Sequence, residues 1–313
     1  MRIGELTVDA VKDGMLTLDY RMLWPNRSES DFVRDTSVVP LHNGMVSIDV
    51  GAFVVQSGDR VMLIDAGSGP ALAPGEMAGA SVDDPAADLV EHLERSGRTG
   101  DAATSAIEVL ASAVVEHGEL IASLESMGVR PTDVTDVVLT HLHHDHVGWV
   151  AVDGTAMFPN AEYHCDKRDA DFFVGPDPTD EAIPRICWGA MSATERLAPV
   201  LDRMKMWSDD TTIAPGVSIL RTPGHTPGSS VVVLSSGTER ALLLGDVVHC
   251  PLEMLDDDWH ALVDVDPVTA QRTRDALFRE IDGDTVLGAP HFPGLEFGRI
   301  LPGEQARRWV PMS

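Results

Sequence analysis

The chain has 313 residues, of which 43% are hydrophobic, and its formal net charge is −27 at pH 7. Enough apolar residues are present for a globular protein with a sizeable core. Because no run of basic residues offsets the acidic balance, nucleic-acid phosphates and anionic membrane surfaces would be repelled. We therefore expect a small-molecule substrate, no nucleic acid and no membrane among the partners.

Three sequence features favour a cytoplasmic location. The N-terminal MRIGELTVDA lacks the basic region and apolar run of a secretory signal. No segment approaches the roughly 18 consecutive apolar residues of a membrane span. The cysteines, Cys165, Cys187 and Cys250, are too few and too scattered for a disulfide framework, which fits a reducing compartment.

The first half of the chain changes in character near residue 70. Residues 1–66 contain β-rich runs separated by Gly, Asn and Asp, which predict a meander of strands: ELTVDAV, MLTLDY, VSIDVGAFVVQ and RVMLIDAG. From Pro70 to about Gly128 helical periodicity dominates. We predict a helical insertion over 71–117 within a single domain that spans 1–313.

After Pro131 strands and helices alternate. DVTDVVLT predicts a strand, AEYHC a strand followed by a helix that opens at Asp166, and TERLAPVLDRMKMW a helix. We then predict three strands, GVSILR, SSVVVLSS and ALLLGDVVH. They are followed by a helix that Asp266 caps, with Pro267 in its first turn, and by a last strand, TVLGAPH. This order predicts packed sheets covered by helices.

Histidines crowd the segment THLHHDHVGW, residues 140–149. In a strand His141 and His143 would project to the same side, with His144 opposite. Asp145 and His146 follow where the chain must turn, and can aim at a point beside the first pair. A lone histidine is more often a hydrogen-bonded core or surface residue than a ligand. A bound cation explains the crowding more economically, since charged imidazoles would repel one another.

Later segments offer further ligands near strand ends. His225 lies in the turn RTPGHTPGSS, Asp246 follows the buried run LLLG, and His291 follows the last predicted strand. Each is weak evidence by itself. Imidazole and carboxylate ligands suit Zn²⁺, with Mn²⁺, Co²⁺ or Fe²⁺ as reasonable substitutes.

The chain resembles the metallo-β-lactamase-fold hydrolases in four segments that occur in the same order: THLHHDHVGW, TPGHTPG, LLLGDVV and APHFPG. The resemblance covers nearly the whole chain apart from the stretch around 71–117. It implies an αββα sandwich, in the α/β (α+β) class, with two divalent metal ions at one edge. By position, His141, His143 and His225 would hold one ion, and Asp145, His146 and His291 the other. Asp246 would bridge them.

The resemblance also assigns a role to Asp65, which ends VMLIDAG. This carboxylate would orient a ligand imidazole through its other ring nitrogen. A turn-forming aspartate after a strand is an equally good interpretation of the sequence alone.

Two metals about 3.5 to 4 Å apart lower the pKa of a shared water toward roughly 7. We expect a bridging hydroxide that attacks a carbonyl or phosphoryl centre, with Asp145 as the catalytic group that handles the proton. Within this family the chain resembles the acyl-homoserine lactonases and the methyl parathion hydrolase group, and its segments GDVVHCPLE and APHFPGLEFGRI look more like the second group. This similarity favours a lactonase or arylesterase, with phosphotriester hydrolysis as the alternative.

Other activities on the same motif fit less well. A zinc β-lactamase usually has an export signal and often a cysteine ligand where Asp246 lies here; Cys250 reads as a buried small residue. A glyoxalase-like thioesterase binds an anionic substrate through basic residues that form no obvious patch. A mononuclear iron dioxygenase stays open as an alternative.

The substrate pocket and the oligomeric state are the least constrained features. Trp149 and Phe292 adjoin ligands and are our candidates for pocket walls, although core packing is the commoner role of such residues. The insertion over 71–117 would cap the site, form a homodimer contact or be a surface embellishment.

Overall fold

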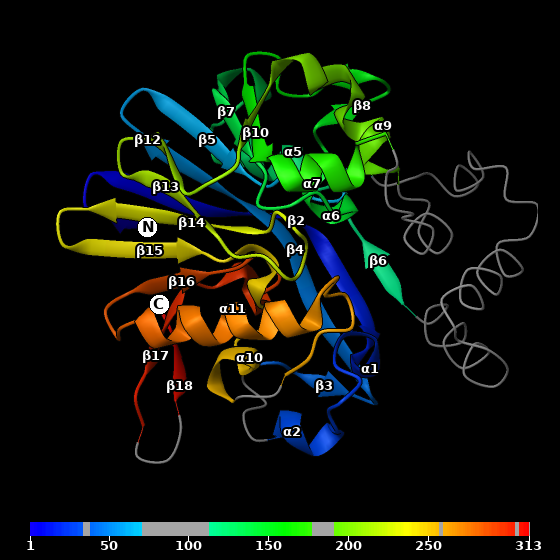
Figure 1. Cartoon of the computed structure of the whole chain (residues 1–313), viewed down its shortest axis with the longest axis vertical. Helices are drawn as coiled ribbons and strands as arrows, with labels where there is room; N and C mark the ends of the chain where they lie inside the picture. Colours follow the sequence, from blue (N-terminus) through cyan, green and yellow to red (C-terminus); the bar gives the residue numbers. More distant parts are fainter. Residues whose placement is uncertain (34–37, 71–112, 177–190, 257–258, 304–306, 313) are drawn as a thin grey trace, which may run out of the picture.

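The computed structural model describes residues 1–33, 38–70, 113–176, 191–256, 259–303 and 307–312. Two mixed sheets form its centre (Figure 1). The first sheet runs β1 (Arg2–Ile3), β2 (Leu6–Asp19), β4 (Met45–Ser57), β5 (Arg60–Ile64), β7 (Asp136–Val138), β10 (Glu162–Asp166) and β11 (Met204–Trp207). In addition, β3 (Leu41–His42) pairs with β4, and β6 (Val114–Glu116) pairs with β2.

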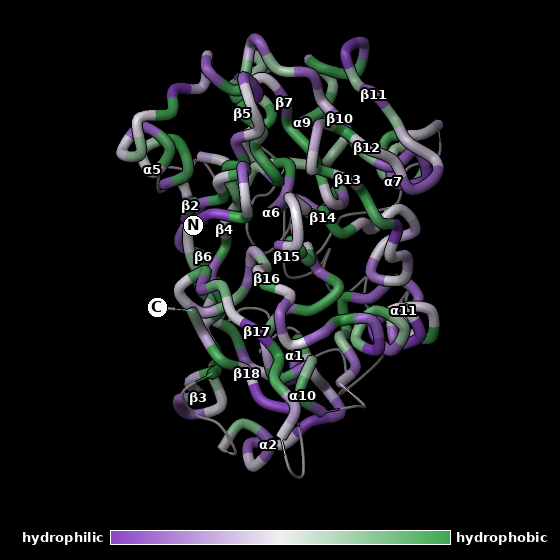
Figure 2. The backbone as a smooth tube through the Cα atoms, turned by 90° about the vertical axis from the view of Figure 1, so that its left-hand side faces the viewer, coloured by the Kyte–Doolittle hydropathy of each residue, from purple (hydrophilic) through white to green (hydrophobic). Residues whose placement is uncertain are grey.

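The second sheet follows the chain more simply. It runs β12 (Thr211–Ala214), β13 (Val217–Arg221), β14 (Ser230–Ser236), β15 (Glu239–Leu243), β16 (Val286–Gly288), β17 (Gly298–Leu301) and β18 (Arg308–Pro311). A small hairpin of β8 (Ala151–Val152) and β9 (Thr155–Ala156) lies apart from both sheets. Figure 2 shows hydrophobic residues concentrated in the strands and hydrophilic ones in the peripheral turns.

Alternating side chains of β4 explain why the sheets stack. Phe53 and Val55 are buried in a cluster shared with strands of the second sheet, whereas Ala52 and Val54 belong to a cluster shared with helices. Because successive side chains of a strand point to opposite faces, β4 is apolar on both. A strand buried on both faces requires a layer on each side of its sheet.

Helices supply the two outer layers. Against the first sheet pack α5 (Leu120–Ser126), α6 (His144–Val147), α7 (Lys167–Phe173) and α9 (Ala193–Leu197). Against the second packs α11 (Pro267–Glu280), which contributes Leu277 to a cluster with Val231 and Leu242 (Figure 1). Short helices α1 (Tyr20–Leu23), α2 (Glu29–Val33) and α10 (Leu252–Leu255) surround a third cluster that contains Trp24 and Trp259. The predicted αββα sandwich is confirmed.

Strand direction places several loops at one edge of the sandwich. β5, β7 and β10 are mutually parallel, and so are β15 and β16. The carboxyl ends of parallel strands open onto the same edge of a sheet. Asp65, the histidine segment, Asp246 and His291 all follow such ends.

Several predicted elements need correction. Residues 141–143 lie in a loop, because β7 ends at Val138 and α6 begins at His144, so His141 and His143 do not share a strand face. Residues 204–207 form β11, not the end of a helix, and 114–116 form β6, not part of a helical insertion. Residues 71–112 lie outside the described residues. The helix caps Asp166 and Asp266 are confirmed, since each side chain accepts a backbone N–H of the helix it precedes.

A buried carboxylate joins the strands of the first sheet away from this edge. Asp136 accepts hydrogen bonds from Arg60, Thr135 and His164. Burial alone would raise its pKa, but these donors hold the pKa well below the usual range. Glu162, Asp136 and His164 lie close enough together to form a possible metal-ligand set. The Arg60 guanidinium already neutralises Asp136, so this group is an ion pair.

Among the described helices none is both long enough and apolar enough to cross a bilayer.

Candidate metal centre

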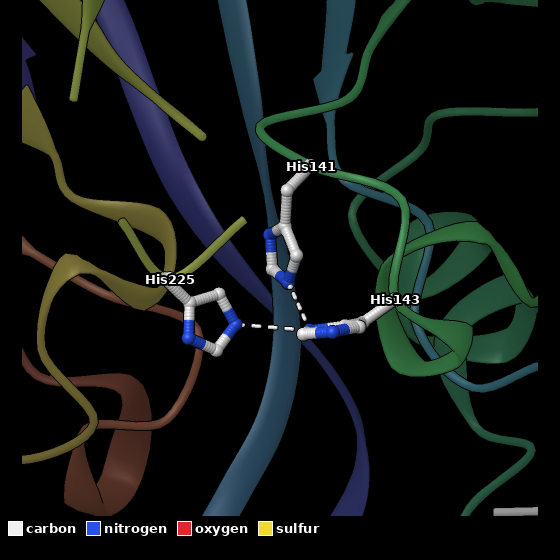
Figure 3. Close-up of side chains that lie close together, drawn as sticks. All are labelled: His141, His143 and His225. Carbon is white, nitrogen blue, oxygen red and sulfur yellow. Dashed lines mark hydrogen bonds between the residues drawn. The ribbon is translucent and has the colours of Figure 1, made fainter. Parts of the chain in front are cut away.

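Three imidazoles converge from two loops far apart in the sequence (Figure 3). His143 Nδ1 lies 3.0 Å from His141 Nε2 and 2.9 Å from His225 Nε2. His225 is carried by the loop between β13 and β14, and the other two by the loop after β7. Tetrahedral zinc with Zn–N bonds of about 2.0–2.1 Å would place neighbouring nitrogens about 3.3 Å apart. The spacing of the three nitrogens is therefore close to that of a metal ligand set.

A second set lies beside the first. Asp145, His146 and His291 bring one ligand atom each to within 4.8 Å of the others. His291 Nε2 is 3.5 Å from Asp145 Oδ2, and His146 Nε2 is 3.9 Å from Asp145 Oδ1. His291 comes from the loop after β16, so this set also joins the two sheets.

Asp246 lies between the two sets. Its Oδ1 is 3.3 Å from His146 Nε2. Its Oδ2 is close to four further imidazoles, at 3.3 Å from His291, 3.5 Å from His225, 3.5 Å from His249 and 3.9 Å from His141. The preceding residue, Gly245, has a positive φ of 51°, and a Cβ there would lie 2.9 Å from Thr140 Oγ1. Glycine thus lets the Asp246 backbone approach the histidine loop.

The donor set fits bound cations. His146 Nε2 and Asp246 Oδ1 are buried without a hydrogen-bond partner within the described part of the chain, an arrangement that is costly for polar atoms with no ligand. Burial and the neighbouring imidazoles lower the pKa of His141 and His143 well below the usual value, so both rings are neutral. Burial alone would raise the pKa of Asp246, but the surrounding histidines hold it well below its usual range. Burial alone would lower the pKa of His146 and His291, but the nearby carboxylates raise it, and a bound cation would take the place of that proton.

A hydrogen bond to the second ring nitrogen orients four of these imidazoles. Nδ1 of His146 contacts Asp65 Oδ2 at 2.9 Å, Nδ1 of His225 contacts Asp264 Oδ1 at 3.1 Å, and Nδ1 of His291 contacts the Asp49 carbonyl at 2.7 Å. For His141 the acceptor is Thr140 Oγ1, at 3.2 Å. When Nδ1 carries the proton, Nε2 keeps its lone pair toward the centre.

Asp65 has the geometry that was predicted for it. Besides His146, it accepts the Thr140 backbone N–H at 2.8 Å and the Thr140 hydroxyl. Its φ of 62° is unusual for a residue other than glycine. Such strain persists where surrounding contacts hold it, and here those contacts orient a candidate ligand.

Asp264 was not predictable from the sequence. This carboxylate is buried between His225 and Arg274, whose Nη1 lies 3.1 Å from Asp264 Oδ2. Burial alone would raise its pKa, but His225 and Arg274 lower it, so it is ionised. It occurs in the unremarkable segment ALVDVDP, where no local pattern distinguishes it from a surface aspartate.

Beside the seven predicted ligands lies one more histidine, His249, which the sequence analysis did not identify. It lies three residues beyond Asp246, with Nε2 3.5 Å from Asp246 Oδ2 and without a hydrogen-bond partner among the described residues. Nδ1 contacts Glu253 Oε1, which also accepts the Trp24 indole N–H at 2.7 Å. Burial alone would lower the pKa of His249, but Glu253 and Asp246 raise it to about 9. The spacing D-x-x-H in GDVVHC was the available signal.

The two candidate wall residues lie in the hydrophobic core. Trp149 is buried with the helices over the first sheet, and its indole N–H donates to Asp13 at 2.8 Å. Phe292 is buried over the second sheet against Trp309. These contacts favour core packing for both, and a pocket role stays a prediction. Cys250 is buried, as expected.

Comparisons with known proteins agree with this architecture. The sequence profile of the family described as the metallo-beta-lactamase superfamily matches residues 49–289. An N-acyl homoserine lactonase of a Bacillus species is 24% identical over 133 residues, 42% of this chain and 45% of the relative. The chain thus spans about half the length of the curated relatives it matches.

Solved structures are similar over almost their full length. AidC, described as a dizinc quorum-quenching lactonase, has a TM-score of 0.74 at 19% identity, covering 100% of this chain and 96% of that one. AbOPH, described as a hydrolase in the beta-lactamase superfamily, has a TM-score of 0.75 at 21% identity and the same coverage. At these identities the likeness shows the fold.

Proposed function

Because the chain belongs to the metallo-beta-lactamase superfamily, we propose that it is a dinuclear-metal hydrolase that opens small-molecule lactones or cleaves aryl esters. One observation carries the proposal: the Asp246 carboxylate lies within 3.3–3.9 Å of imidazoles from both ligand sets. A carboxylate in that position can bind two cations at once. Zinc suits the ligands best among divalent ions.

Different residues of the chain would hold the cations and orient the ligands in such a reaction. His141, His143 and His225 would hold one cation, and Asp145, His146 and His291 the other, with Asp246 shared. Bound cations lower the pKa of a water molecule and neutralise negative charge that develops on the substrate. Asp65, Asp264 and Thr140 keep the imidazoles in one orientation, which avoids reorganisation during reaction.

Asp145 is the site carboxylate nearest to solvent. Its side chain is 16% exposed, against 5% for Asp246. The nearby histidines overcome the effect of burial and hold its pKa well below the usual range, so the group is ionised. An ionised carboxylate that is partly exposed to solvent can accept a proton from the attacking water and pass it on.

The choice of substrate class rests on the motifs and on similar proteins. The Bacillus relative and AidC are described as lactonases, and both share the superfamily fold. A substrate of that kind needs no cluster of basic residues, which agrees with the net charge of −27. We extend the proposal to a small-molecule substrate, a homodimer and a cytoplasmic location, as the sequence suggested.

A substrate panel tests the proposal. We expect metal-loaded protein to turn over a lactone or aryl ester faster than a phosphotriester or thioester. His143→Ala should lower that turnover at least about 100-fold, since it removes a ligand that two other imidazoles contact. His42→Ala, which alters an exposed histidine of β3, should leave turnover unchanged. If His143→Ala is as active as the parent, the metal centre is not the catalytic site.

A further inference from the structure

Helix α7 presents a buried carboxylate to the loops that carry the three-histidine set. The helix begins after its N-cap, Asp166, and its third residue is Asp169, which has no exposed surface. Phe173, one turn further on the same face, packs edge-on against the His143 ring, with centroids 5.4 Å apart. The helix therefore contacts the histidine loop directly.

Asp169 connects two loops whose histidines, His143 and His225, are 82 residues apart in the sequence. Its Oδ2 accepts the Thr226 hydroxyl at 2.8 Å, and its Oδ1 accepts the Gly228 backbone N–H at 2.6 Å. The backbone N–H of Leu142 also lowers the pKa of this carboxyl group, which places the His141–His143 loop beside it. Leu142 separates His141 from His143, and Thr226 directly follows His225.

Gly228 is required for this close approach. A Cβ at that position would lie 2.8 Å from Asp169 Cγ and 2.7 Å from Asp166 Cβ. Both distances are shorter than real Cβ contacts, so any larger residue would push the His225 loop away from α7. The turn TPGHTPG thus has a glycine where the loop meets the carboxylate.

The carboxylate is costly to bury. The hydrogen-bond donors named above are an uncharged hydroxyl and two amides, and burial raises its pKa to about 7 despite them. A buried charged group without a cationic partner is a poor stabiliser compared with an apolar residue of similar size. Its hydrogen bonds to Thr226 and Gly228, which follow a candidate ligand, point instead to a role in placing that loop.

We propose that Asp169 is a positioning residue that fixes the separation of the His141–His143 loop from the His225 loop, and so sets the affinity of these three histidines for their cation. The inference rests on the proposed metal centre. It predicts a selective effect, because within the described residues Asp145, His146 and His291 make no hydrogen bond or ion pair with this carboxylate.

The test is a titration of metal-free protein with cobalt(II). Visible absorption monitors the binding, and competition with a chromophoric chelator gives the affinity of each site. Asp169→Asn is nearly isosteric but offers only one acceptor oxygen to the three donors. We expect one of two cobalt sites to weaken by about 10–100-fold and the other to keep its affinity. Asp166→Asn is the matched control, because this neighbouring buried carboxylate caps α7 and pairs with Arg168 and Arg221, and the substitution leaves its Cβ, which lies beside Gly228, unchanged. It should leave both affinities unchanged.

A second pair of variants decides the matter if Asp169→Asn does not fold. Thr226→Val removes the hydroxyl at constant shape and should reproduce the selective weakening, whereas Thr226→Ser keeps the hydroxyl and should restore parental affinity. Unchanged cobalt binding in Asp169→Asn and Thr226→Val would overturn the positioning role while leaving the metal centre intact. Equal weakening of both sites in Asp166→Asn would also overturn it. A parent that binds no pair of cobalt ions would refute the proposed function itself.

Discussion

Asp246→Asn should lower turnover of the best substrate at least about 10³-fold, the largest effect expected of any single substitution. Asparagine keeps the shape of the side chain but removes its charge and replaces one carboxylate oxygen with an NH₂ group. That group would face either His146 or the four imidazoles near Oδ2, and it cannot bind a cation. Steady-state kinetics with excess metal measure the loss.

Asp266→Asn is a suitable control for this substitution. Asp266 caps α11 and lies two residues beyond Asp264, but its side chain bonds to Thr269 and is exposed. Because asparagine caps a helix about as well as aspartate, it should keep the fold and change turnover by no more than about twofold. Asp246→Asn with turnover within tenfold of the parent would contradict a bridging role.

Removal of metal should destabilise the fold by about 5 kcal/mol. A ligand that binds only the folded state at 100 times its Kd contributes about 2.7 kcal/mol, and two cations are expected. Without them, the buried ligand atoms of His146 and Asp246 lack partners, which adds to the cost. Urea unfolding followed by circular dichroism, with and without chelator, measures the difference.

The same experiment has an internal control. In Asp246→Asn the difference between metal-loaded and chelated protein should shrink, because the variant holds its cations more weakly. Superimposable unfolding curves for the loaded and chelated parent would show that the buried cluster folds without needing a cation.

The layers of the fold were predictable because each rests on a local pattern. Runs such as VSIDVGAFVVQ are long and apolar enough to specify a strand, and Asp266 with Pro267 marks a helix start that tertiary contacts do not override. The short strands β6 and β11 were not predictable in this way. Their residues fit a helical period as well as a strand, and pairing with β2 and β10 decides the outcome.

The candidate ligands were predictable for a different reason. His141, His143, Asp145 and His146 stand out by crowding, whereas His225, Asp246 and His291 became convincing only through the family resemblance. The residues that orient them have no such signal. Asp264 and Asp169 resemble surface aspartates in the sequence, and only tertiary packing brings their carboxylates to the histidine loops.

A metal count is the most direct test of the central claim that seven side chains hold two catalytic cations. Protein stripped with chelator, reloaded with zinc and freed of excess ions should contain two equivalents per chain by elemental analysis, and Asp246→Asn should contain fewer. One equivalent of iron together with oxygen uptake, or less than one equivalent of any divalent metal, would contradict the account.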